Sequence, residues 1–172
     1  NRSFQANQYV LSKASPEGKQ KYYNLLFKKF EVDSIDELIL KFISYGTKVE
    51  DNFISMATPE GQQKYWNEYI INQGMYGHDL EEDIISKGTE STKKRYKELR
   101  YRYLMDKAED GWQISVDSLS KYSPEDQREY WKLFFDYHGV ESIDEYVTLA
   151  VEEDFRVSQE YLSMASPETQ EY

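Results

Sequence analysis

The stretch FISMATPE, residues 53–60, combines the end of one helix, a tight junction and the start of the next helix. Thr58 stands where a helix N-cap belongs, because a short hydroxyl there accepts a hydrogen bond from a free N–H of the first turn. Pro59 suits the first helical position, where its missing N–H costs nothing. Glu60 complements the positive end of the helix dipole. The stretch therefore predicts two helices that meet at Thr58.

Close variants of this junction recur along the chain. A second motif, Ser-Ile-Asp-Glu, occurs at residues 34–37 and again 108 residues later at 142–145. The first and fourth junctions are also 108 residues apart, and so are the second and fifth. Because self-similarity of this kind is typical of repeat proteins, we predict a single region, residues 1–172, with a 108-residue super-repeat. Its five junction copies, and hence its units, start near these residues: Pro16, Pro59, Glu90, Pro124 and Pro167.

Apolar residues after each junction are spaced as on one face of a helix. The two Ser-Ile-Asp-Glu motifs are capping boxes, in which the Ser is the N-cap and the Glu follows three residues later. We expect short helices from about residue 49 to 56 and from about 155 to 164, and the longest helix from about 91 to 109. No strand pattern competes. The predicted fold is all-α, with tandem helical hairpins stacked as a helical repeat or elongated bundle.

Aromatic residues are abundant, with 16 Tyr, 8 Phe and 3 Trp. Pairs of them follow three junctions, at residues 22–23, 65–66 and 130–131. As core residues, they would set the spacing between helical layers; on the surface, a row of them would form a binding stripe. We interpret them mainly as core. The candidate protein-binding residues are one from each pair, namely Tyr23, Trp66 and Trp131.

A serine four residues before each junction also recurs, at positions 12, 55, 86, 120 and 163. A ladder of modified or ligand-binding serines is one interpretation. We favour a structural one, in which the hydroxyl lies in a last helical turn and bonds a nearby carbonyl or the facing helix.

Charge and composition exclude several classes of partner. The net charge of −11 argues against nucleic acid, which needs a basic face. No apolar run approaches the roughly 20 residues of a membrane helix, so we predict no membrane insertion. The chain has no Cys, which excludes disulfides and thiolate chemistry and is compatible with the cytoplasm and with secretion or surface display alike.

Two acidic stretches imitate metal sites. Residues 106–117 resemble a calcium loop, but its third position lacks an oxygen ligand, so we interpret it as a helix end, a break at Gly111 and a new cap at Ser115. His78 and Glu82 are one helical turn apart, which an acidic first turn explains without a metal. With two His, no Cys and no phosphate-binding or nucleophile motif, we predict no catalytic, cofactor or metal residues and no enzyme.

Tandem helical units with recurring Trp and Tyr resemble, in outline, the WY-type modules of oomycete effectors. The spacing matches none of the motifs of that family, so no residue role carries over. The leading hypothesis is a non-enzymatic helical-repeat protein that acts as a structural or protein-binding array. Because the chain stops at Tyr172, just inside a new unit, we expect a longer array or head-to-tail self-association. The alternative is a secreted or surface-displayed protein, effector- or adhesin-like, that engages a host or partner cell protein.

Overall fold

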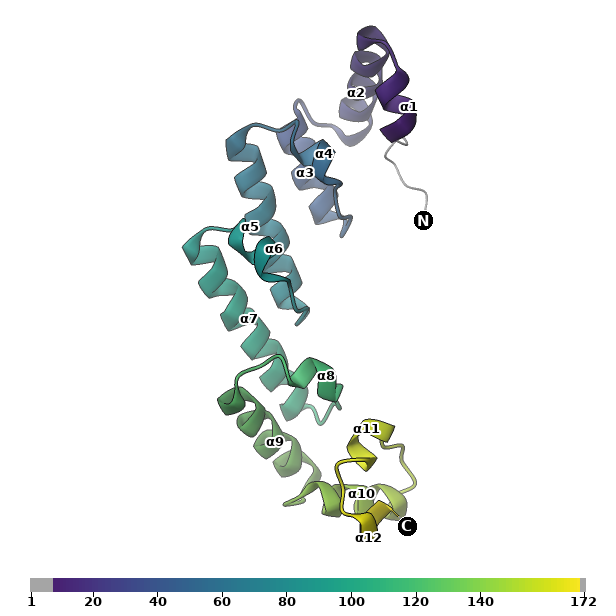
Figure 1. The fold of residues 1–172 in the computed structure, drawn as a ribbon, viewed down its shortest axis with the longest axis vertical. Helices are drawn as coiled ribbons and strands as arrows, with labels where there is room; N and C mark the ends of the chain where they lie inside the picture. Colours follow the sequence, from purple (N-terminus) through teal and green to yellow (C-terminus); the bar gives the residue numbers. More distant parts are fainter. Residues whose placement is uncertain (1–7, 171–172) are drawn as a thin grey trace. The chain divides into compact units, whose positions relative to one another are not determined.

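The computed structural model describes residues 8–170, which form α-helices joined by turns and short loops, without a strand in that range (Figure 1). The predicted all-α class is thus confirmed. The bounds are α1 Gln8–Lys13, α2 Pro16–Phe30, α3 Ile35–Ser44, α4 Asp51–Ile54, α5 Pro59–Met75, α6 Glu82–Ser86, α7 Glu90–Glu109, α8 Val116–Leu119, α9 Pro124–His138, α10 Ile143–Glu152, α11 Gln159–Leu162 and α12 Pro167–Gln170. None of these helices is both long enough and apolar enough to cross a membrane.

The chain divides into two compact units, the first ending at Tyr69 and the second beginning at Ile70. The boundary lies within the continuous helix α5, so no linker separates the units. In the first unit, fully buried side chains come from α3, α4 and α5, among them Leu38, Phe53 and Tyr65. In the second unit, a cluster that includes Leu104 of α7, Phe134 of α9 and Tyr146 of α10 forms the core.

Four of the five junctions are capped as the sequence predicts. At these four, the cap hydroxyl accepts a hydrogen bond from the N–H three residues later; these caps are Ser15, Thr58, Thr89 and Ser123. At the fifth, the Ser166 hydroxyl lies 3.1 Å from the Thr169 hydroxyl instead. The structural interpretation of the recurring serines is confirmed at four positions, where the hydroxyl donates to the carbonyl three residues earlier: Ser55, Ser86, Ser120 and Ser163.

Each Ser-Ile-Asp-Glu motif makes the same bonds. The Ser34 hydroxyl accepts from Glu37 N at 3.2 Å, and the Glu37 carboxylate accepts from Asp33 N at 2.8 Å. The counterparts at Ser142 and Glu145 have the same two distances, 3.2 and 2.8 Å. The two motifs, which lie 108 residues apart, therefore share their local hydrogen bonds as well as their sequence.

The Asp of the motif acts on a more distant helix. Asp36 accepts a bond of 2.8 Å from Thr58 N, and its other oxygen accepts from the Thr58 hydroxyl, at the start of α5. Asp144 likewise accepts a bond of 2.6 Å from Ser166 N, at the start of α12. Each motif thus caps the helix that it begins, α3 or α10, and also binds the start of a second helix further along the chain, α5 or α12.

The predicted starts of two short helices are wrong. Helix α4 begins at Asp51 rather than near Val49; Val49 lies in the loop before it, where its N–H donates to the Tyr65 hydroxyl at 3.2 Å. Helix α11 begins at Gln159 rather than near Phe155, because the Phe155 N–H donates to the Ala150 carbonyl at the end of α10. The longest helix, α7, spans Glu90–Glu109, close to its predicted bounds.

Candidate protein-binding site

Buried tyrosines occupy the same position in helices that follow the junctions, six residues after the junction residue. The hydroxyl of each forms a hydrogen bond with the backbone of an earlier loop. The Tyr65 hydroxyl accepts from Val49 N in the loop before α4. The Tyr96 hydroxyl accepts from Leu80 N at 2.8 Å and donates to the His78 carbonyl at 2.9 Å, in the loop before α6. Loop N–H and C=O groups that lack a helical partner are therefore satisfied by a side chain from the next long helix.

The same arrangement recurs before α8 with an additional hydroxyl. Tyr130 accepts from Ile114 N at 3.1 Å and donates to the Trp112 carbonyl at 2.9 Å. Tyr161 of α11 lies 2.8 Å from the Tyr130 oxygen, shares the Ile114 N–H at 3.1 Å and donates to the Ile114 carbonyl at 2.9 Å. Burial raises the pKa of the Tyr130 and Tyr161 hydroxyls, which keeps both protonated and able to donate.

The loop 111–114 is held at every residue. Gly111 has a φ of 69°, and a Cβ there would lie 2.3 Å from the Tyr137 ring, so glycine is required both for conformation and for space. Trp112 N donates to the Lys107 carbonyl at 2.8 Å, which closes the end of α7.

The third residue of this loop, Gln113, joins it to the segment after α10. Its amide nitrogen donates to the Tyr146 hydroxyl at 2.9 Å and to the Arg156 carbonyl at 3.2 Å, while its amide oxygen accepts from Ser158 N at 3.0 Å. A loop with this many internal partners has little conformational freedom left to lose on binding.

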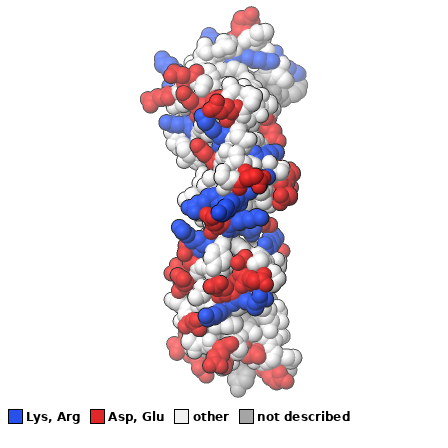
Figure 2. All heavy atoms as spheres, turned by 90° about the vertical axis from the view of Figure 1, so that its left-hand side faces the viewer, with Lys and Arg blue, Asp and Glu red and all other residues white. Residues whose placement is uncertain are grey.

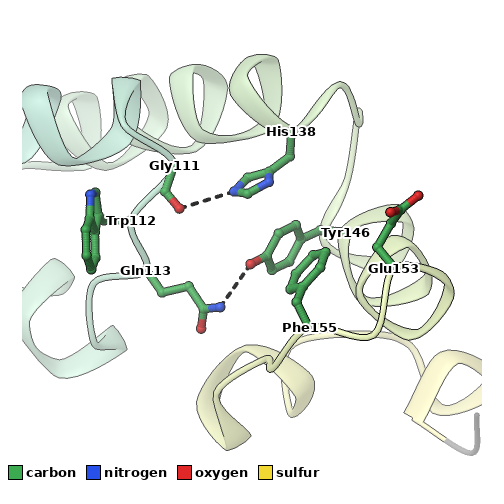
Figure 3. Close-up of a pocket in the computed structure, with 7 residues that line it drawn as sticks. All are labelled: Gly111, Trp112, Gln113, His138, Tyr146, Glu153 and Phe155. Carbon is green, nitrogen blue, oxygen red and sulfur yellow. Dashed lines mark hydrogen bonds between the residues drawn. The ribbon is translucent and has the colours of Figure 1, made fainter.

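The Trp112 side chain points away from these bonds. It leaves 60% of its surface exposed, and the Lys107 ammonium lies 4.9 Å from its ring centroid. An open pocket of about 630 Å³ adjoins it, with Trp112 at one end and Glu153 at the other (Figure 3). The rings of His138, Tyr146 and Phe155 form the wall between those ends. Exposed tryptophan beside an aromatic hollow is typical of protein-binding surfaces.

The predicted aromatic residues lie elsewhere and pack mostly inward. Trp66 is only 9% exposed and packs edge-on against tyrosines of its own helix. Tyr23 is half-buried, with its hydroxyl 3.3 Å from the Met56 sulfur. Trp131 is half-buried and stacks on Phe135, with ring centroids 5.3 Å apart. None of the three lines the pocket beside Trp112, and partner binding by them stays a prediction.

Sequence reasoning missed Trp112, although a signal was available. The residue directly follows Gly111, the break at the end of a long helix, and lies outside any helical apolar stripe. A large aromatic side chain in such a turn has no core face to join. The interpretation of residues 106–117 itself is confirmed, since α7 ends at Glu109 and Ser115 caps α8.

No three His, Cys, Asp or Glu side chains are grouped to hold a metal ion within residues 8–170. Comparisons with protein-family models, with curated proteins and with solved structures gave no match.

Proposed function

We propose that the protein is a non-enzymatic helical-repeat scaffold, built of tandem helical hairpins, that binds a protein partner through Trp112 and the adjoining pocket. The observation that carries the proposal is the exposed indole on a tied loop: 60% of Trp112 is free, while its own backbone and that of Ile114 are bonded. A fixed aromatic anchor pays little ordering entropy on association, and tryptophan is enriched among residues that dominate binding energy.

Recurring bonds support the repeat arrangement within this proposal. The cap hydroxyls, the Ser-Ile-Asp-Glu bonds and the loop-binding tyrosines use equivalent positions in successive copies. Such nearest-neighbour bonding is typical of solenoid-like arrays, whose surfaces serve as scaffolds for other proteins.

Surface charge favours a partner of opposite sign. The protein carries a net charge of −11, and the face in Figure 2 shows both acidic and basic side chains. A basic or neutral protein segment would approach such a surface with less repulsion than an acidic one, and its association would slow as salt is added.

Selection of displayed peptides on the immobilised full chain tests the proposal. Random peptides enriched on the wild type should bind in solution, and Trp112→Ala should weaken that binding at least tenfold, because removal of a central aromatic anchor typically costs about 2 kcal/mol or more. Isothermal titration calorimetry gives the two dissociation constants. The matched control is Tyr76→Ala, since Tyr76 is similarly exposed, at 62%, on the segment after α5.

Failure to enrich any peptide, or enriched peptides that bind Trp112→Ala as tightly as the wild type, would refute the proposed site. Sedimentation of the two proteins alone distinguishes the head-to-tail form of the proposal. In that form the partner is a second copy of the chain, and the wild type associates at concentrations where Trp112→Ala stays monomeric.

A further inference from the structure

The pocket beside Trp112 is lined by a partly exposed aromatic ring, Phe155, and by a carboxylate, Glu153. Phe155 leaves 36% of its surface exposed, and its ring stacks on His138 with centroids 6.3 Å apart and planes 21° apart. Glu153, two residues earlier, is exposed and lies at the end of the pocket opposite Trp112 (Figure 3). An aromatic face attracts a cation through its quadrupole, and a carboxylate adds charge attraction.

Neighbouring charges direct an incoming cation to the Phe155 end. Residues 152–154 are all acidic and exposed, and they outweigh the single positive charge of the exposed Arg156 that follows. At the other end, the Lys107 ammonium already lies 4.9 Å from the Trp112 ring centroid. A second cation at Trp112 would meet that ammonium, whereas one at Phe155 would meet a surplus of carboxylates.

The chain itself shows how a counterpart loop accommodates a cation. The loop 77–80 corresponds to the loop 111–114, because each starts with a glycine of positive φ and is tied by a tyrosine hydroxyl. Beside it, the Arg100 guanidinium pairs with Asp79 at 2.7 Å and lies 4.5 Å from the ring centroid of Tyr122. A guanidinium held between a carboxylate and an aromatic ring is therefore already part of this fold.

We infer that the protein partner places an arginine side chain in the pocket, with its guanidinium against the Glu153 carboxylate and over the ring of Phe155. This inference rests on the proposed function and names the chemistry that the partner must carry. A planar guanidinium can bond a carboxylate through two N–H groups and stack on a ring at the same time, which a lysine ammonium cannot do. The rest of the partner segment then reaches Trp112, where apolar side chains contact the indole.

A titration followed by two-dimensional NMR of the full chain tests the inference. The probes are the pentapeptide acetyl-Gly-Ser-Arg-Ser-Gly-amide and the same peptide with citrulline, a neutral analogue of arginine. The arginine peptide should bind weakly and shift the backbone amides of Gln113, Glu153 and Phe155. The citrulline peptide should bind about fivefold more weakly, and so should the arginine peptide to Glu153→Gln, because each change removes one charge from the pair.

The matched control is Glu68→Gln, which removes one exposed carboxylate on α5 and should leave the affinity unchanged. Equal affinity of the arginine and citrulline peptides, shifts confined to other segments, or an unchanged affinity in Glu153→Gln would each overturn the inference. Its failure is distinct from failure of the proposed function. If selected peptides depend on Trp112 but carry no arginine, the binding site stands and only its arginine chemistry is refuted.

Discussion

A single hydroxyl group on Tyr96 satisfies two backbone groups of the loop before α6, Leu80 N and the His78 carbonyl. Tyr96→Phe leaves both without that partner, and we expect it to lower the free energy of unfolding by about 2 kcal/mol. Tyr130→Phe should cost less, about 1 kcal/mol, because the Tyr161 hydroxyl still accepts from Ile114 N. Urea denaturation measures both losses.

The exposed Tyr76 supplies the control, since its replacement by Phe should change the unfolding free energy by no more than the error of the measurement. A Tyr130→Phe variant that loses as much stability as Tyr96→Phe would contradict the idea that the two hydroxyls at Ile114 share one task.

Alkaline pH should destabilise the protein through another loop-binding tyrosine, Tyr65. Burial raises the pKa of the Tyr65 hydroxyl to about 12, above its ordinary value near 10. The unfolded chain therefore releases this proton first, so the stabilisation is complete below pH 10 and is lost as pH rises toward 12. Unfolding free energies measured from pH 8 to 11.5 should fall, and the fall should be shallower in Tyr65→Phe. An identical slope in the two proteins would count against this assignment.

At the scale of elements, the stability of α5 depends on the close contact between the Asp36 carboxylate and the first turn of the helix. A Cβ at Gly61 would lie 2.3 Å from the carboxyl carbon of Asp36, which is fixed by its bonds to Thr58. Gly61→Ala should therefore destabilise the protein by about 1–2 kcal/mol, because it overpacks this contact and displaces the cap. Thermal or urea unfolding gives the value.

Gly18 is the matched position in α2, two residues after Pro16 as Gly61 is after Pro59. A Cβ there meets its nearest atom at an ordinary 3.5 Å, so Gly18→Ala should stabilise the helix by up to about 1 kcal/mol. In an Asp36→Ala background, Gly61→Ala should lose most of its cost. Equal effects at the two glycines would show that Asp36 is not the cause.

The sequence predicts those features of the helices that depend on neighbouring residues. The junction caps at Ser15 and Ser123 bond residues within one helical turn, so the local sequence is enough to predict them. The start of α4 follows a loop that a distant residue holds, since the Val49 N–H donates to the Tyr65 hydroxyl, sixteen residues later. That bond depends on how two helices pack, and no local pattern records it.

The proposed binding site follows the same rule. The sequence directs attention to aromatic residues within helices, such as Trp66 and Trp131, whose regular spacing also serves core packing. The exposure of Trp112 follows from tertiary bonds at Ile114 and Gln113 that join segments more than thirty residues apart. Those bonds, which the sequence does not reveal, are what mark Trp112 as a candidate anchor on a fixed loop.

For the whole molecule, the two compact units should respond separately to a core change. Phe134 is fully buried in the cluster of the second unit, and Phe134→Ala should cost about 3–5 kcal/mol there. Native-state hydrogen exchange should then speed up at amides such as Ile114 and Tyr146 and stay unchanged at Leu38 and Ile39 of the first unit. Equal acceleration in both units would mean that the chain opens as one cooperative body.

The central claim is that a tied loop holds Trp112 ready for a partner. Backbone ¹⁵N relaxation of the free protein at residues 111–114 tests it most directly, because it reports the mobility of the loop before anything binds. The account predicts order parameters of about 0.85, equal to those of the flanking helices. Values below about 0.6 for Trp112 and Gln113 would contradict it, since a loop that moves so freely cannot present a fixed anchor.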